Sequence, residues 1–295
     1  LTKKELDKKM SSLIEEGLIS ENSKVVLVND GSKDKTWEII TKVHKENDMY
    51  VGINLTRNRG HQNALLAGLM YAKNHADICI SMDADLQDDI NVMDDMIKKY
   101  NAGADVVYGV RSSRKKDTFF KKFTAEAFYK LMNVMGVEVV FNHADCRLMS
   151  KRALEGLSEF KEVNLFLRGI VPQIGYKTDI AYYERSERVA GESKYPLKKM
   201  LAFAIDGITS FSIKPLRMIT SIGFIILILS FVVLIYSVIM KLIGNTVSGW
   251  TFIVCSIWLI GGIQTLCLGV IGEYIGKIYK ETKARPRYII ECVLD

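Results

Sequence analysis

The sequence predicts an α/β fold in which a mixed, mostly parallel sheet is flanked by helices, with further helices in or on a membrane. Two observations predict this arrangement. Short apolar or β-branched segments alternate with amphipathic helical segments over the first two thirds of the chain, a pattern typical of layered, mostly parallel sheets. Two long stretches without a charged residue, Met218–Met240 and Leu242–Gly272, follow near the C-terminus.

The expected elements follow from local patterns. Helices are predicted where apolar residues recur at three- and four-residue steps, as for Leu6, Met10 and Leu13, and strands where short apolar runs end at turn residues such as Gly31. The predicted strands cover 24–28, 50–55, 78–80, 104–110, 144–149 and 177–183. The predicted helices cover 1–20, a segment around Trp37 and Val43, 63–76, 89–100, 117–135 and 151–157, with a helical or bent segment over 164–175.

Composition limits the function classes. The chain has 295 residues and a net charge of +6, from 40 Lys and Arg against 34 Asp and Glu. This mild excess does not argue for a nucleic-acid-binding protein. The five cysteines show no metal-ligand spacing, which fits reduced thiols in a cytoplasmic compartment. The four histidines form no paired array, and we expect them to be surface or packing residues, with only His61 near a motif.

The two uncharged stretches predict membrane-spanning helices over about 218–240 and 250–272, because each exceeds the roughly 20 apolar residues that a helix needs to cross a bilayer. The alternative is a pair of buried helices in a soluble core, although helices that are apolar on all sides are rare there. Over residues 196–216, apolar residues at helical spacing with lysines beside them predict an amphipathic helix on the membrane surface. The alternative is an ordinary packed surface helix.

Flanking charge predicts the orientation of these helices. Between the two stretches there is only Lys241, whereas basic residues lie before the first and after the second: Lys198, Lys199, Lys214, Arg217, Lys277, Lys280, Lys283, Arg285 and Arg287. By the positive-inside rule, both termini and the α/β domain are cytoplasmic. The predicted organisation is an α/β domain over 1–195, the amphipathic helix over 196–216, the membrane region over 217–276 and a cytoplasmic tail over 277–295.

Two carboxylates, Asp83 and Asp85, follow the predicted strand over 78–80. In extended chain, residues two apart point to the same side, so both side chains are expected at the carboxyl end of a strand, where open α/β sheets bind ligands. A hard cation, Mg²⁺ or Mn²⁺, suits such a pair and usually completes its coordination with substrate phosphates. The alternative is a solvated acidic turn, since Asp88 and Asp89 follow at once.

Five segments in one order resemble glycosyltransferases of family 2, which have the Rossmann-like GT-A fold. Within that family the chain resembles the polyprenyl-phosphate glycosyltransferases, which include dolichol-phosphate mannose synthases and bactoprenol (undecaprenyl-phosphate) glucosyltransferases. The segments are Asp-Gly-Ser at 30–32, Arg-Asn-Arg-Gly-His at 57–61, Asp-Ala-Asp-Leu-Gln-Asp at 83–88, Ala-Asp-Cys-Arg-Leu at 144–148 and Arg-Val-Ala-Gly-Glu-Ser-Lys-Tyr at 188–195. Gly-Glu-Tyr-Ile-Gly-Lys at 272–277 follows the two apolar stretches.

The resemblance implies a metal-dependent, inverting transferase of the bacterial cytoplasmic membrane. It would move a hexose, with glucose as the default, from a UDP-sugar to a polyprenyl phosphate. Its partners would include membrane lipid, and a homo-oligomer is one possible arrangement. On the donor side, Asp30 could accept a hydrogen bond from the uracil imide. Arg57 could pair with the diphosphate. Asp83 and Asp85 would hold the metal, whose charge stabilises the leaving group. Gln87 would complete the shell of the metal or of the sugar, and Asp83 and Gln87 also belong to the predicted nucleotide- and sugar-binding set.

On the acceptor side, Asp145 is the candidate catalytic base or orienting carboxylate. Asp85, as a metal ligand, is the second candidate catalytic residue. Arg168 and the loop residues Arg188, Ser193 and Lys194 are candidates for holding the lipid phosphate. Each assignment has a plainer alternative. Asp30 could simply form an Asx turn, and Arg57 could be an ordinary surface residue. Asp145 could be a buried partner of Arg147, and the 188–195 loop a mobile charged loop.

Two departures from the family pattern bear on the donor side. The family usually has Asp where this chain has Asn29, and it opens with a strand carrying Pro-x-Tyr-Asn-Glu, which this sequence lacks. We therefore expect a sequence that is incomplete at its N-terminus. Two other readings stay open: a polysaccharide synthase, disfavoured by the absence of Gln-x-x-Arg-Trp, and a membrane-anchored scaffold with an inactive site. Other sugars, such as N-acetylglucosamine, mannose or a modified arabinose, are not distinguished by the sequence.

Overall fold

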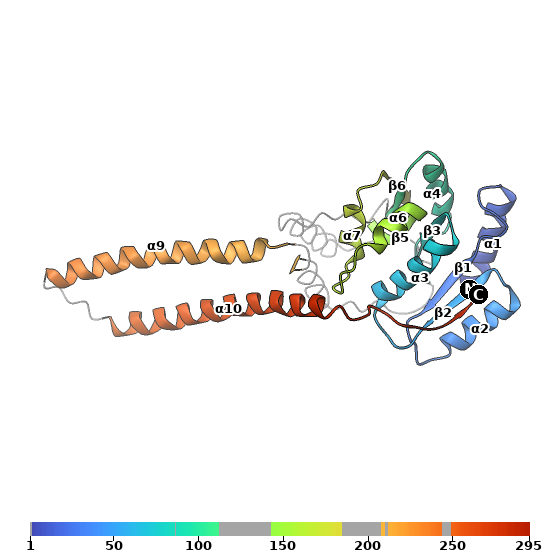
Figure 1. The fold of residues 1–295 in the computed structure, drawn as a ribbon. Helices are drawn as coiled ribbons and strands as arrows, with labels where there is room; N and C mark the ends of the chain where they lie inside the picture. The colour runs from blue at the N-terminus through green and yellow to red at the C-terminus, as the bar shows by residue number, and fades with distance from the viewer. Residues whose placement is uncertain (1, 86, 112–142, 185–207, 210–211, 244–248) are drawn as a thin grey trace.

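The structure is a computed structural model that describes residues 2–85, 87–111, 143–184, 208–209, 212–243 and 249–295. Figure 1 shows an α/β body that contains both chain termini, and two long helices, α9 and α10, that extend away from it on one side. The predicted helix over 117–135 and about two thirds of the predicted amphipathic helix over 196–216 lie outside the described residues.

The described strands form two sheets. Strands β1 (Val25–Asn29), β2 (Tyr50–Leu55) and β7 (Ile290–Leu294) form one sheet in the order β1-β2-β7. The second sheet has the order β3-β5-β4-β6 and contains β3 (Ile78–Ser81), β4 (Val106–Arg111), β5 (His143–Ser150) and β6 (Thr178–Tyr183).

The expectation of a mixed sheet is confirmed, but the expectation that it is mostly parallel is wrong for the described residues, whose strands form two sheets. Only the β1–β2 and β4–β6 pairs are parallel, whereas β7 is antiparallel to β2, and β5 is antiparallel to both β3 and β4. The sequence pattern of alternating strands and helices holds from β1 to β4, but β5 and β7 enter the sheets after long intervening segments and run the opposite way. The sheets are mixed.

Helices cover the faces of these sheets at the predicted positions. Their bounds are α1 (Thr2–Glu15), α2 (Thr36–Glu46), α3 (His61–His75), α4 (Val92–Asn101), α6 (Lys151–Ser158) and α7 (Leu167–Gln173). Helix α6 has a conventional N-cap, in which the Ser150 hydroxyl accepts a hydrogen bond from the Ala153 N–H. Helix α3 packs on both sheets, because its Ala64 and Ala67 meet β2 residues while its Leu66 and Leu69 face the second sheet.

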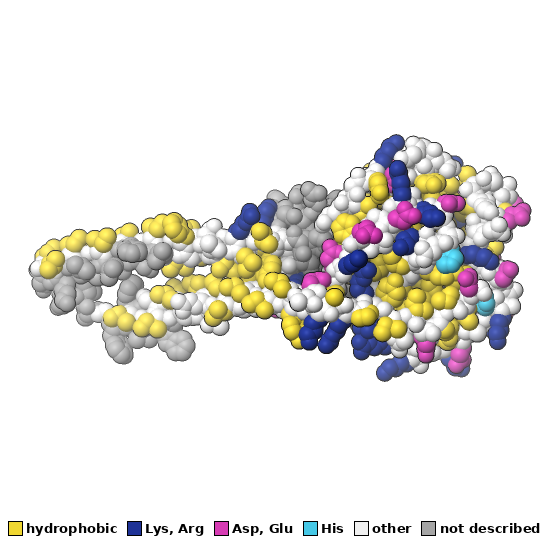
Figure 2. All heavy atoms as spheres, viewed as in Figure 1, with side chains coloured by type: hydrophobic (Ala, Val, Ile, Leu, Met, Phe, Trp, Pro, Cys, Tyr) yellow, Lys and Arg dark blue, Asp and Glu magenta, His cyan; other side chains and the backbone are white. Residues whose placement is uncertain are grey.

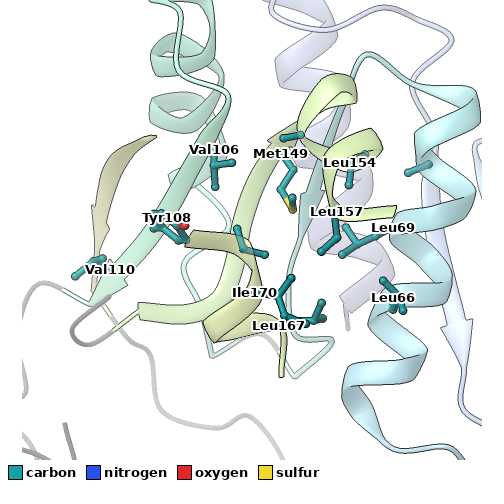
Figure 3. Close-up of a cluster of buried hydrophobic side chains, with 13 residues drawn as sticks. Leu66, Leu69, Val106, Tyr108, Val110, Met149, Leu154, Leu157, Leu167 and Ile170 are labelled. Atoms are coloured by element: carbon teal, nitrogen blue, oxygen red, sulfur yellow. The ribbon is translucent and has the colours of Figure 1, made fainter. Parts of the chain in front are cut away.

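The main core lies between the second sheet and helices α3, α6 and α7. Figure 3 shows Val106 and Tyr108 of β4 and Met149 of β5 turned toward Leu154 and Leu157 of α6, with Leu66, Leu69, Leu167 and Ile170 closing the cluster. Nearly all of these side chains are fully buried, and each contributes about 1.5–3 kcal/mol through burial. The opposite face of the sheet packs on α4 and on Leu13 of α1.

The two long helices coincide with the predicted membrane region. Helix α9 covers Lys214–Leu242 and α10 covers Trp250–Lys283. Within α10, the segment Leu259–Lys283 is long and apolar enough to cross a membrane by length and composition. Leu259, Leu266 and Leu268 are about two-thirds exposed, which is unusual for large apolar side chains facing water. Figure 2 shows apolar side chains along both helices and basic ones where the helices join the α/β body.

The predicted C-terminal tail over 277–295 contains the end of a helix and a strand. Helix α10 continues to Lys283, and the chain then returns to the α/β body, where β7 pairs with the edge of β2. The segment Tyr288-Ile289-Ile290 and the residues after it form an apolar and β-branched run that is typical of a strand. Its partner strand β2 lies more than two hundred residues earlier in the sequence, so the pairing has no local signal.

The turns after β1 and β2 pack against each other through Gly31. Gly31 has φ +60°, and a Cβ added there would lie 2.4 Å from the Arg57 carbonyl carbon and 2.6 Å from the Asn58 nitrogen. Both neighbours are backbone atoms, which cannot rotate away. Glycine is therefore required for the two turns to approach each other at the carboxyl ends of the strands.

We predict that Gly31→Ala destabilises the protein much more than Gly17→Ala, which serves as the matched control. Gly17 has φ +68° but no atom near its added Cβ, so this variant carries only the left-handed backbone penalty of about 1 kcal/mol. Gly31→Ala adds the backbone clash and should cost at least about 2 kcal/mol more. Thermal unfolding of both variants measures the difference, and equal unfolding temperatures would contradict the close approach.

Candidate functional site

Asp30 connects the two packed turns. Its carboxylate accepts hydrogen bonds from the backbone N–H groups of Arg59 at 2.7 Å and Gly60 at 2.9 Å. These bonds fix the turn after β2 against the end of β1. Arg57 lies exposed in the same turn, next to Gly31. The two predicted donor residues, Asp30 and Arg57, therefore lie together at one edge of the molecule.

The predicted metal ligands lie in a turn after β3. The strand ends at Ser81, and Ala84 and Asp85 are in turn conformation, so the expected strand-like alternation between Asp83 and Asp85 is wrong. One Asp85 oxygen instead accepts the Gln87 N–H at 3.1 Å, which stabilises the turn. The Gln87 side chain is buried, while Asp83 is about two-fifths exposed.

Asp145 lies at the centre of a group of cations. Its Oδ1 accepts hydrogen bonds from Arg147 Nη2 at 3.2 Å and Arg168 Nε at 3.1 Å, and its Oδ2 accepts one from Arg168 Nη2 at 3.0 Å. Arg168 thus binds the carboxylate with two parallel bonds, the strongest arrangement for such a pair. His61 Nε2 lies 3.3 Å from Asp145 Oδ2.

Local structure brings these residues together from different segments. The Ser81 hydroxyl donates to the Asp145 carbonyl oxygen at 2.8 Å, which joins β3 to β5 beside the site. The side-chain oxygen of Gln62, at the start of α3, accepts the N–H of Leu167, at the start of α7, at 2.8 Å. Because His61 precedes Gln62 and Arg168 follows Leu167, this bond also fixes the two partners of Asp145 relative to each other.

The surroundings of Asp145 keep it ionised. Burial of this side chain opposes ionisation, but hydrogen bonds from His61 and Arg168 and the charges of Arg168 and Arg147 outweigh that effect and hold its pKa well below the usual range. A general base works best with a pKa near the operating pH, so this carboxylate is poorly suited to accept a proton. The geometry suits an orienting role.

Arg147 is the most unusual member of the group. Its side chain is 1 % exposed, and burial lowers its pKa. Its Nη2 bonds to Asp145, but its Nε and Nη1 have no hydrogen-bond partner in the described part of the chain. Buried donors without partners cost about 1–3 kcal/mol each. The contact with Asp145 is therefore the one favourable polar interaction that the described residues offer this buried guanidinium.

His61 was not expected in the site. Its Nε2 lies between two carboxylates, 3.3 Å from Asp145 Oδ2 and 3.8 Å from Asp83 Oδ1. The hydrogen bond to Asp145 raises the pKa of His61, which burial and the charge of Arg168 partly oppose. His61 thus links the Asp83 carboxylate to the Asp145 carboxylate. The signal was its position at the end of the Arg-Asn-Arg-Gly-His motif, immediately before a helix.

The carboxylates around Asp83 fit a bound cation. Burial raises the pKa of Asp83, and the negative charges of Asp145, Asp88 and Asp85 raise it further, with only His61 acting in the opposite direction among the principal causes. Among the described residues there is no group of three or more His, Cys, Asp or Glu placed to hold a metal. Two carboxylates with substrate phosphates are, however, a common set of ligands for Mg²⁺.

Asp88 connects the acidic turn to the ends of two strands. Its Oδ1 accepts a hydrogen bond from the Tyr183 hydroxyl at 2.6 Å and lies 3.4 Å from Arg111 Nη2. Tyr183 ends β6, directly before the segment that carries the predicted acceptor residues Arg188, Ser193 and Lys194. Those three residues lie outside the described part of the chain. The structure thus brings together Asp83, Asp145 and Arg168, and places Asp30 and Arg57 at the neighbouring turns.

Known proteins resemble this chain over most of its length. The family model Glycosyl transferase family 2 matches residues 3–158. The chain is 54 % identical over 293 residues to the uncharacterized glycosyltransferase YkoT of Bacillus subtilis, covering 99 % of this chain and 87 % of that protein. It is 44 % identical over 269 residues to the bactoprenol glucosyl transferase of Shigella phage SfX, covering 90 % and 88 %. It is also 43 % identical over 280 residues to the prophage bactoprenol glucosyl transferase homolog of Escherichia coli, covering 94 % and 91 %. The chain belongs to glycosyl transferase family 2.

Proposed function

We propose that this protein transfers a hexose, with glucose as the first candidate, from a UDP-sugar to undecaprenyl phosphate or a similar polyprenyl phosphate. The product is a lipid-linked monosaccharide for glycosylation of the cell envelope. The observation that carries the proposal is the convergence of Asp83, His61, Asp145 and Arg168 in one site, at the carboxyl end of β3 and beside the turns that contain Asp30. Relatives named as bactoprenol glucosyl transferases support the choice of sugar and acceptor.

In the proposed donor site, Asp30 and Arg57 contact the nucleotide and diphosphate. Asp83 and Asp85, with Gln87 beside them, hold Mg²⁺ or Mn²⁺. The metal, when bound, neutralises the charge that develops on the diphosphate as the bond to the sugar breaks. A carboxylate has about four acceptor positions. The N–H groups of Arg59 and Gly60 occupy two of those on Asp30, so the others are available to the uracil of the nucleotide.

In the proposed acceptor site, cations hold the lipid phosphate. A phosphate monoester is already anionic near neutral pH and needs little deprotonation, which agrees with an Asp145 that stays ionised. Asp145 then acts by holding Arg168 and His61 in fixed positions, so that in-line attack on the sugar carbon occurs from one geometry. Arg188, Ser193 and Lys194 contribute further contacts to the phosphate from the loop before the membrane region.

The proposed membrane arrangement is multi-pass. Helices α9 and α10 both cross the cytoplasmic membrane, with the α/β body and both termini on the cytoplasmic side, where nucleotide sugars are available. The basic residues at the base of the two helices support this orientation. Self-association within the membrane is compatible with it.

The proposal is tested by incubating the purified full chain with radiolabelled UDP-sugars and undecaprenyl phosphate in vesicles. We expect label to enter the lipid phase from UDP-glucose at a rate at least about tenfold above UDP-N-acetylglucosamine or GDP-mannose, because a site that bonds one pattern of hydroxyls discriminates strongly against another. Transfer of a different sugar would reassign the donor. Absence of any transfer, with the protein folded, would favour a scaffold without catalysis.

Asp85→Asn is expected to abolish transfer while changing the unfolding temperature by only a few degrees. The side chain is at a half-exposed turn, so little core packing depends on it. Transfer by the unchanged protein should stop in EDTA and return when Mg²⁺ or Mn²⁺ is added. Asp89→Asn, in the same acidic segment, is the matched control and should retain transfer. Full activity in EDTA would exclude the metal.

Arg147→Met is expected to lower transfer about tenfold or more without loss of stability. Methionine fills a similar volume without two unpaired buried donors, so the unfolding temperature should stay within a few degrees or rise. Asp145 loses one partner and its fixed orientation, which slows the reaction. Arg152→Met, which breaks an Arg–Asp pair on Asp105 away from the site, should leave the transfer rate unchanged. A fall in activity that only follows a fall in stability would make Arg147 a packing residue.

A further inference from the structure

The chain after α10 is built into the α/β body. Before the helix ends, the Glu281 carboxylate accepts the N–H groups of Val163 at 2.8 Å and Asn164 at 2.7 Å. Arg287 Nη1 then donates to the Phe160 carbonyl oxygen at 2.8 Å, and the N–H of Thr56 donates to the Ile289 carbonyl oxygen at 3.1 Å. Strand β7 completes this path along the edge of β2. Thr56 directly precedes Arg57, so the returning segment reaches the turn of the proposed donor site.

A chain of side-chain hydrogen bonds crosses the sheet from β7 to β1. Asn54 Nδ2 donates to Glu291 Oε2 at 2.6 Å, and Asn29 Nδ2 donates to Asn54 Oδ1 at 2.7 Å. Asn29 Oδ1 in turn accepts the N–H of Ser32 at 3.3 Å. Both Asn29 and Asn54 are buried, at 3 % and 8 % exposed. This series of hydrogen bonds therefore ends in the turn that contains Asp30 and Gly31.

The direction of these bonds is determined by Glu291. An ionised carboxylate can only accept, so Asn54 must present its NH₂ group to Glu291 and its oxygen to Asn29. Asn29 must then donate to Asn54, which leaves the Asn29 oxygen to accept from Ser32. No other arrangement satisfies all three side chains. A donor is needed at position 29, which explains why Asn suits this chain where the family usually has Asp.

We propose that Glu291 is a positioning residue for the donor site, acting through Asn54 and Asn29 on the turn that holds Asp30. This inference rests on the proposed function, which places the nucleotide at that turn. The segment that follows α10 thereby orients the nucleotide-binding turn through the fixed donor-to-acceptor direction of the hydrogen bonds that join the exposed Glu291 to the buried Asn54 and Asn29.

The proposal predicts a reversal between two variants. In Asn29→Asp, the introduced carboxylate faces the side-chain oxygen of Asn54, so two hydrogen-bond acceptors meet. Rotating the Asn54 amide by half a turn would place that oxygen against the Glu291 carboxylate, which is again a pair of acceptors. We expect the KM for the UDP-sugar to rise at least about fivefold, with a smaller change in kcat. In the double variant N29D/E291Q, Asn54 turns over, donates to the carboxylate introduced at position 29 and accepts from the amide introduced at position 291. The KM should then return to within about twofold of the unchanged protein.

The test measures the KM for the UDP-sugar and amide hydrogen exchange of residues 29–32 in the full chain, with Glu21→Gln at an exposed position as control. A higher KM and faster exchange in Asn29→Asp, both reversed in the double variant, support the proposal. An unchanged KM and exchange in Asn29→Asp, or no recovery in the double variant, would overturn it. If the unchanged protein used no UDP-sugar, the proposed function would fail, while hydrogen exchange would still report on the bond chain.

Discussion

The site depends on a balance of charge around one buried carboxylate. Asp145 is held between Arg147, Arg168 and His61, and it lies close enough to Asp83 for the two negative charges to affect each other. Removing Asp145 would leave the buried Arg147 guanidinium without compensation, which is costly at low dielectric, whereas Asp145 without Arg147 would keep Arg168 and His61 as partners. The second sheet supplies Asp145 and Arg147, the start of α3 supplies His61, and the start of α7 supplies Arg168. The packing of these elements is therefore also the assembly of the site.

Local patterns in the sequence predicted most elements within a few residues. Strand β2 was predicted at 50–55 and lies there, and the helix predicted over 151–157 is α6, at Lys151–Ser158. The second sheet's antiparallel strand β5 was located but its direction was not, because direction depends on long intervening segments rather than on residue pattern. The division into two sheets likewise depends on which edges meet, and no local signal encodes that.

The site was only partly predictable. The motifs identified Asp83 and Asp145 as candidates, Arg168 was a further candidate outside the motifs, and the structure brings these three together. His61 was assigned to the surface because a single histidine has no spacing pattern, and its role arises from α3 meeting β5. Arg147 was considered only as a partner of Asp145, since burial of a whole guanidinium cannot be seen from its neighbours in sequence. Strand β7 was missed because it pairs with a strand more than two hundred residues earlier.

That long separation has a consequence for how the protein is made. Strand β7 follows both long helices in the chain, so it emerges from the ribosomal exit tunnel only after α9 and α10 have emerged. Until then β2 has an open edge, and Asn54 has no carboxylate to pair with. Domains otherwise tend to fold as they emerge from the ribosome. Here the first sheet is finished last, so its completion is coupled in time to the emergence of both long helices from the ribosome.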